Sequence, residues 1–94
     1  MKTENQTVKV RQFDGRNGAV KNQFVLTIGN SRLFQSYDSI IVKIEGDSIT
    51  LDEKYWDYSK TTGKYRNQFL GEKKQDTEKK IREGVYKLAN LNIG

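Results

Sequence analysis

The stretch SIIVKIEGDSITLD, residues 39–52, decides the fold that we predict. Apolar and polar residues alternate on both sides of the dipeptide Gly46-Asp47, which is typical of strands because successive side chains point to opposite faces. A Gly-Asp pair suits a short turn between two antiparallel strands. We therefore predict a β-hairpin whose apolar face lies in the core and is formed by Ile40, Val42, Ile44, Ile49 and Leu51.

The chain before this hairpin repeats the same pattern. Val8 and Val10 alternate with charged residues, and Phe24, Leu26 and Ile28 share one face of a second alternating run. Glycine and asparagine separate the runs, and both tolerate the positive φ that tight turns need. We predict three half-buried strands here, in TVKVRQF (7–13), NQFVLTI (22–28) and SRLFQSY (31–37).

The chain after the hairpin changes character. Residues 53–71 fit neither a strand period nor a helix period, and the small polar residues of 59–63 predict a loop inside an aromatic-rich segment. Residues 72–84 are good helix formers, with acids early, cations late and Gly84 in the position that commonly follows a helix. Residues 85–91 predict a last strand that closes the sheet.

These elements predict a single small domain, 1–94, of the α+β class. Its main feature is a mainly antiparallel β-meander of about five to six strands, followed by one short C-terminal helix. A small, partly open barrel with the helix as a plug or lid is the alternative. The apolar fraction is only 34%, so we expect aromatic side chains, Trp56 among them, to be buried in the core.

Composition narrows the possible chemistry. The chain has no cysteine and no histidine, which removes disulfides, thiolate metal sites and the usual general base. Asp52, Glu53 and Asp57 could meet a hard cation, but their spacing matches no EF-hand, and Asp47 belongs to a turn. We therefore expect no catalytic residue, no metal and no cofactor. With no membrane-length apolar run and no signal-peptide segment, a soluble cytoplasmic protein is expected.

The net charge of +5 is unevenly distributed. Residues 31–53 carry two cations and five acids, whereas residues 54–82 carry nine cations and four acids. Cations beside exposed aromatic rings suit single-stranded nucleic acid, because they contact phosphates while the rings stack on bases. Arg66 has a competing role, since it could pair with Asp57 or Glu72. The candidate binding residues are Tyr58, Lys60, Lys64, Tyr65, Arg66, Lys73 and Lys80.

Three segments resemble a family of small uncharacterised proteins from bacteriophages, prophages and other mobile elements, chiefly of low-GC Gram-positive bacteria. The segments are FQSYDSIIVKI (34–44), YWDYSKTTGKYRNQFLGE (55–72) and DTEKKIREGVYKLANLN (76–92). The last two carry the patterns W-x-Y-S-x-T-T, Y-R-x-x-F-L-G and G-x-Y-x-L-x-x-L-N. The resemblance covers about residues 34–92 and leaves residues 1–33 outside. It implies no known activity, so no functional residue is transferred.

The expected function is that of a non-enzymatic accessory protein of a phage or mobile element. Such a protein would bind a host or phage macromolecule, and inhibition of a host defence or replication component is one form of that role. The alternative is direct binding of DNA or RNA through a basic and aromatic face. Neither function involves a membrane or a small-molecule cofactor.

Overall fold

The computed structural model describes residues 8–15 and 18–92. One sheet contains all the described strands, in the order β1-β2-β3-β4-β5-β6. Neighbouring strands are antiparallel except for the parallel β5–β6 pair. The elements follow the chain as β1 (Val8–Gly15), β2 (Gly18–Ile28), β3 (Ser31–Ser36), β4 (Ser39–Glu45), β5 (Ser48–Asp52), α1 (Lys60–Leu70), α2 (Lys74–Arg82) and β6 (Lys87–Ala89).

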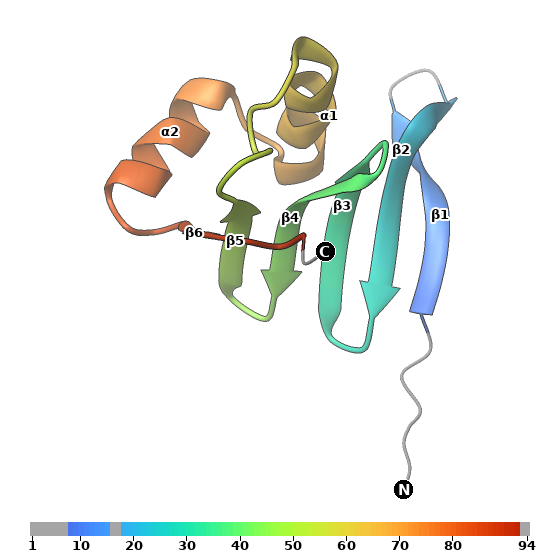
Figure 1. Cartoon of the computed structure of the whole chain (residues 1–94), viewed down its shortest axis with the longest axis horizontal. Coiled ribbons are helices and arrows are strands. Elements are labelled where there is room, and N and C mark those ends of the chain that lie inside the picture. The colour runs from blue at the N-terminus through green and yellow to red at the C-terminus, as the bar shows by residue number, and fades with distance from the viewer. Residues whose placement is uncertain (1–7, 16–17, 93–94) are drawn as a thin grey trace, which may run out of the picture.

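The sheet is open, with β1 at one edge and β6 at the other. In Figure 1, α2 lies at the β5 side of the sheet, α1 lies above β3 and β4, and β1 stands at the far edge. The α+β class and the meander are therefore confirmed, but the expected single helix is wrong, because the described residues form two. Neither of these two helices is long and apolar enough to cross a membrane.

The β4–β5 hairpin confirms the central prediction. Its turn is Gly46-Asp47, and Gly46 has a φ of 60°, which glycine adopts without steric cost. Paired residues across the hairpin share a face of the sheet. These pairs are Val42 with Leu51, both fully buried, and Ile44 with Ile49.

One member of the predicted apolar face is displaced by a β-bulge. Phe34 of β3 pairs with Val42, but the next residue, Gln35, pairs with Ile40, so Ile41 is the extra residue. Ile41 is 1% exposed, whereas Ile40 is only half-buried. The prediction that Ile40 belongs to the core face is wrong, because the bulge turns its neighbour inward instead.

The core lies between the sheet and the helices. Phe34 of β3 stacks on Phe69 of α1 with ring centroids 5.6 Å apart, and Phe13 of β1 meets Tyr65 of α1 edge-on. Fully burying one large apolar side chain stabilises a fold by about 1.5–3 kcal/mol. Aromatic rings therefore contribute much of the packing, as the low apolar fraction predicts. The buried apolar residues are Phe13, Val25, Phe34, Ile41, Val42, Leu51 and Tyr86.

Helix α1 occupies the segment for which a loop is predicted. Ser59 caps its N-terminus, because the hydroxyl oxygen accepts the N–H of Thr62 at 3.1 Å. The Thr62 hydroxyl lies 3.0 Å from that of buried Ser36 on β3, so the turn is also fixed from outside the helix. Threonine and glycine are weak helix formers. The contacts of Thr62 and of buried Gly63 override that local preference.

The side chain of Asp52 fixes the C-terminal segment to the end of β5. Asp52 is 1% exposed and accepts the backbone N–H groups of Lys54, Tyr55 and Leu91 at distances of 3.0, 2.8 and 2.8 Å. Burial raises the pKa of Asp52, but these hydrogen bonds outweigh burial and hold the pKa below its ordinary value. The carboxylate therefore stabilises the backbone at the end of β5 and binds the segment that follows β6.

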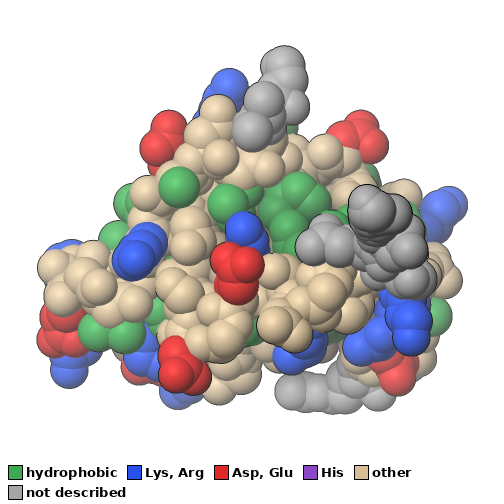
Figure 2. All heavy atoms as spheres, turned by 90° about the horizontal axis from the view of Figure 1, so that it is seen from below, with side chains coloured by type: hydrophobic (Ala, Val, Ile, Leu, Met, Phe, Trp, Pro, Cys, Tyr) green, Lys and Arg blue, Asp and Glu red, His purple; other side chains and the backbone are tan. Residues whose placement is uncertain are grey.

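The face of the sheet opposite the helices is only partly covered. Val8 and Val10 of β1 are 52% and 60% exposed. The pairing register places half-buried Leu26 and Ile28 beside them, with Leu33 next in the row. Hydrophobic side chains gather in the middle of the surface shown in Figure 2. β1 is a strand as predicted, but its first two valines face outward rather than into the core.

Candidate functional site

The first turn of α1 separates two hollows in the surface. We call them the basic pocket, of about 610 Å³, and the tyrosine pocket, of about 290 Å³. The basic pocket is lined chiefly by Asp57, Ser59, Lys60, Lys64, Arg66 and Lys74. The tyrosine pocket is lined chiefly by Ser36, Tyr37, Asp38, Tyr55, Tyr58 and Thr62.

Arg66 is the buried cation of the basic pocket. Its side chain is 1% exposed, and Nη1 donates to the carbonyl oxygen of Trp56 at 2.7 Å and to Asp57 Oδ1 at 3.1 Å. Nη2 donates to Asn67 Oδ1 at 2.9 Å, while Nε has no partner among the described residues. One positive charge is thus fixed in the wall of the pocket, shielded from solvent.

The basic pocket carries a surplus of positive charge. Lys60, Lys64 and Lys74 line it with Arg66, and Asp57 is the only acid among the described residues that do so. Lys74 Nζ lies 2.7 Å from Asp57 Oδ2, and Arg66 holds Oδ1. Burial raises the pKa of Asp57, but Lys74 and Arg66 outweigh burial and hold the pKa below its ordinary value. Four cations against one carboxylate make the pocket attractive to an anion.

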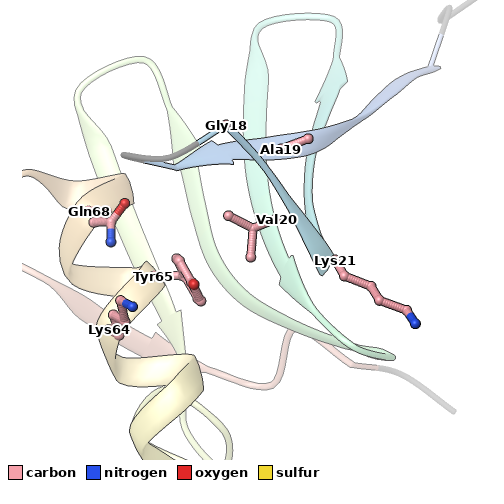
Figure 3. A pocket seen from close by; sticks show the side chains of 7 residues that line it. All are labelled: Gly18, Ala19, Val20, Lys21, Lys64, Tyr65 and Gln68. Carbon is pink, nitrogen blue, oxygen red and sulfur yellow. The ribbon is translucent and has the colours of Figure 1, made fainter.

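A third hollow adjoins the basic pocket at Lys64. This hairpin pocket has a volume of about 570 Å³ and lies between β2 and α1. Figure 3 shows Val20 and Tyr65 facing one another within it, whereas Lys21 points away. Lys64 lines both hollows, and its Nζ is 5.2 Å from the centroid of the Tyr65 ring. Lys64 therefore connects the two hollows.

A family model covers most of the chain. Residues 4–84 match the family of unknown function DUF8033. The chain belongs to this family. The match includes most of residues 1–33, which the resemblance to phage proteins left outside. No curated protein and no solved structure matches the chain.

In this DUF8033 chain, several predicted binding residues lie around one helical turn. Lys60, Lys64 and Arg66 line the basic pocket, and Tyr58, which is 70% exposed, lines the tyrosine pocket. Tyr65 is half-buried and packs against the core. Arg66 pairs with Asp57, one of its two expected partners, and it contributes to the pocket from the interior rather than from an exposed position.

Lys73 and Lys80 lie apart from this turn. Lys73 is exposed at the start of α2. Lys80 Nζ donates to Glu72 Oε1 at 2.6 Å, and the hydroxyl of Tyr86 donates to the same oxygen at 2.9 Å. Burial raises the pKa of Glu72, but hydrogen bonds from Lys80, Thr77 and Tyr86 outweigh burial and hold the pKa below its ordinary value. Glu72, in the link before α2, thus binds both Lys80 of α2 and Tyr86, the residue before β6.

Trp56 meets the expectation of a core aromatic in part. It is half-buried and packs against the core cluster. The guanidinium carbon of Arg66 lies 5.2 Å from the centroid of its ring. A cation over an aromatic face is favourable when both are shielded from water, so Trp56 helps to hold Arg66 in the wall of the basic pocket.

The three acidic residues considered as cation ligands have separate surroundings. Asp52 accepts backbone N–H groups, Asp57 binds Arg66 and Lys74, and Glu53 is exposed. Asp47 lies in the β4–β5 turn, as predicted. In the part of the chain that the structure describes, no group of three acidic side chains could hold a metal ion.

The binding residues predicted from sequence do not include Lys74, Tyr37 and Asp38. Lys74 lies on the helix that follows α1, and its reach to Asp57 depends on how the two helices pack. Tyr37 and Asp38 form the β3–β4 turn. A signal for them exists, because Tyr37-Asp38-Ser39 resembles Gly46-Asp47-Ser48 of the next hairpin. The shared Asp-Ser pair marks both tripeptides as turns, and only one of them begins with a tyrosine.

Proposed function

We propose that the protein is a non-enzymatic binding protein and that its macromolecular partner is single-stranded nucleic acid. Support comes from the arrangement around the first turn of α1, which has cations on one flank and exposed tyrosines on the other. Proteins that hold single strands combine a cationic track for the phosphates with aromatic rings for the bases. A strand laid across this turn would place a phosphate in the basic pocket and a base in the tyrosine pocket.

The basic pocket would supply the phosphate contacts. Lys60 and Lys64 are exposed and free to turn towards a ligand. The first turn of α1 adds backbone N–H groups and the positive end of the helix dipole. Arg66 is buried behind these lysines and held by Trp56 and Asp57, so it adds positive potential to the pocket from a fixed position. Contacts of this kind would fix the strand without reading its sequence.

Tyr58 would supply the stacking surface. Its ring is 70% exposed and meets the ring of Tyr55 edge-on, with centroids 5.4 Å apart. An edge-on aromatic pair is favourable, so Tyr55 supports Tyr58 in one orientation. A base that stacks on such a ring contributes about 1–3 kcal/mol to binding.

Salt dependence of binding tests this function. A labelled oligothymidylate should bind with submicromolar Kd, and four phosphate contacts predict a slope of about −3 for log K against log salt concentration. Lys64→Ala should reduce the magnitude of that slope by about 0.7. Tyr58→Ala should weaken binding by about 1–3 kcal/mol.

Lys79→Ala is the matched control, because Lys79 is an exposed lysine of α2 outside the basic pocket. It should leave the slope close to that of the wild type. Affinity no better than the nonspecific range of about 10⁻⁴ to 10⁻⁶ M, with equal effects of Lys64→Ala and Lys79→Ala, would contradict the proposed function.

A protein partner is the second candidate, and the open face of the sheet favours it. Val8 and Val10 are exposed there, beside a hollow of about 410 Å³ lined in part by Ile28 and Leu33. Apolar surface of this kind often marks a protein-binding site. Together with the resemblance to phage and mobile-element proteins, it supports a cytoplasmic accessory protein that inhibits a host defence or replication component.

Val10→Lys tests the second candidate. It places a charge on the open face, so a host protein captured there by the wild type should be lost. Binding of the oligothymidylate should stay unchanged, because Val10 lies on the opposite face from the helices. A host protein retained equally by both forms would exclude this face as its binding site.

A further inference from the structure

Three two-residue turns of the meander share one backbone feature. They join β2 to β3, β3 to β4 and β4 to β5, and their first residues have φ values of 58°, 55° and 60°. Two of these residues are glycine, Gly29 and Gly46, as left-handed turn positions favour. The third is Tyr37, and a bulky residue with positive φ is an outlier. Among these three described turns, one thus has a tyrosine where the other two have glycine.

Neighbouring residues hold Tyr37 in this strained conformation. Its N–H donates to the carbonyl oxygen of Asn22 at 2.7 Å, and its own carbonyl oxygen accepts from Gln35 Nε2 at 2.7 Å. The residue is 52% exposed, so burial of the ring does not explain its presence. Strained residues of this kind are concentrated at ligand-binding positions. The strain therefore indicates a ligand-binding role for the tyrosine pocket, which Tyr37 lines.

The tyrosine pocket has the composition of a site for one flat ring that donates hydrogen bonds. Tyr37, Tyr55 and Tyr58 offer aromatic surface, and Asp38 is the only charged residue among the described residues that line the pocket. Its volume of about 290 Å³ lies just below the range of about 300–1,000 Å³ for small-molecule sites, which suits a single base. An ionised carboxylate only accepts hydrogen bonds, and its two oxygens can accept two parallel ones.

We propose that the tyrosine pocket takes a guanine base, stacked on the tyrosine rings and bonded to Asp38 through N1–H and the N2 amino group. This assignment rests on the proposed function and adds a base preference to it. Guanine presents two adjacent N–H donors on its Watson–Crick edge. Adenine, cytosine and thymine each present at most one donor group there, next to an acceptor that would face the carboxylate.

Oligothymidylates that carry one central guanine, adenine or cytosine test the preference, with fluorescence anisotropy at physiological salt as the readout. The guanine oligonucleotide should bind about tenfold more tightly than the others. Asp38→Asn should remove this difference. Asp47→Asn makes the same change at the matched position of the β4–β5 turn and should preserve it. Equal affinities of the wild type for the guanine, adenine and cytosine oligonucleotides would overturn the assignment. A preference for guanine that remains in Asp38→Asn would also overturn it.

Tyr37→Gly separates binding from folding. Gly46 adopts nearly the same φ in the matched turn, so glycine at position 37 should leave the melting temperature unchanged or higher. It should weaken binding of the guanine oligonucleotide by about tenfold, because one stacking surface is lost. Tyr37→Phe retains the ring and should retain the affinity. A Tyr37→Gly variant that binds like the wild type would overturn the role of the ring.

Mononucleotides distinguish a failure of this assignment from a failure of the proposed function. Chemical-shift titrations with GMP and AMP, followed at the amides of Tyr37 and Tyr58, report on the pocket alone. If no oligonucleotide binds but GMP saturates these shifts at a lower concentration than AMP, the proposed function fails and the pocket assignment stands. If oligonucleotides bind without preference and GMP behaves like AMP, the assignment fails and the function stands. If no probe binds, both are overturned.

Discussion

Arg66 and Lys74 contact the same carboxylate, Asp57, from different surroundings. The side chain of Arg66 is 1% exposed and that of Lys74 is 49% exposed. When the buried partner of an ion pair is removed, the remaining groups lose hydrogen bonds that water cannot easily replace. When the exposed partner is removed, water and salt replace most of the interaction.

Arg66→Ala should therefore lower the free energy of unfolding by about 2–4 kcal/mol, at the lower side of the range for buried pairs because Asp57 is partly exposed. Lys74→Ala should cause a much smaller loss. Urea unfolding at neutral pH measures both. Losses of similar size would show that Arg66 is not the better-shielded partner.

Asp52 should make stability depend on pH. Its pKa in the folded protein lies below the ordinary value, so the unfolded chain takes up a proton first as the pH falls. The stabilisation is fully present above the unfolded pKa of about 3.9 and is lost as the pH falls through the lower folded pKa. Asp52→Asn should destabilise the protein by about 1.5–3 kcal/mol at pH 7.

The difference between the wild type and Asp52→Asn should shrink below about pH 4. Urea unfolding of both proteins across the acidic range tests this. If the difference in unfolding free energy stays constant down to about pH 2, the three N–H groups do not stabilise the charged form of the carboxylate.

At the scale of elements, the β-bulge in β4 reverses the roles of two adjacent isoleucines. Ile41→Ala should cost about 2–4 kcal/mol, because the side chain is fully buried and its removal leaves a cavity. Ile40→Ala should cost clearly less, since that side chain is only half-buried. Thermal or urea unfolding of the two variants compares them directly. A larger loss for Ile40→Ala would restore the unbulged strand that simple alternation predicts.

The strands could be predicted because their signals are local. Alternation around Gly46-Asp47 specifies the β4–β5 hairpin without any knowledge of the rest of the chain. Helix α1 could not be predicted in this way. Its first turn contains the weak helix formers Thr62 and Gly63, and the Thr62 hydroxyl lies 3.0 Å from the hydroxyl of Ser36 on β3. That partner is known only once the helix has packed on the sheet.

The residues of the candidate site also differ in whether they could be predicted from local sequence. Tyr58, Lys60 and Lys64 could be selected from sequence because they are close together in the chain. Tyr37 and Asp38 could not, since a separate hairpin turn brings them to the same pocket. The burial of Arg66 could not be predicted from sequence either. Arginine is mostly exposed in folded proteins, and nothing in the neighbouring residues marks this one as buried.

At the scale of the whole molecule, the strands of the sheet are arranged in sequence order from β1 to β6. In the chain, both helices occur between β5 and β6, which are neighbours in the sheet. Residues 53–86 therefore leave the sheet at β5 and return directly beside it at β6. All the described residues that line the basic pocket belong to this segment, 53–86. The tyrosine pocket combines it with the β3–β4 turn, so the two parts must dock before that pocket exists.

The parallel β5–β6 pair has a kinetic consequence. Each hairpin of the meander closes a short loop. β6 can pair with β5 only after the long segment between them has folded back, and closing a longer loop has a larger entropic cost. The three residues of β6 should be the first part of the sheet to detach and the last to join. In native-state hydrogen exchange, the amides of Lys87–Ala89 should exchange sooner than those of β3 and β4. Protection of β6 equal to that of β4 would instead mean that the sheet opens only as one unit.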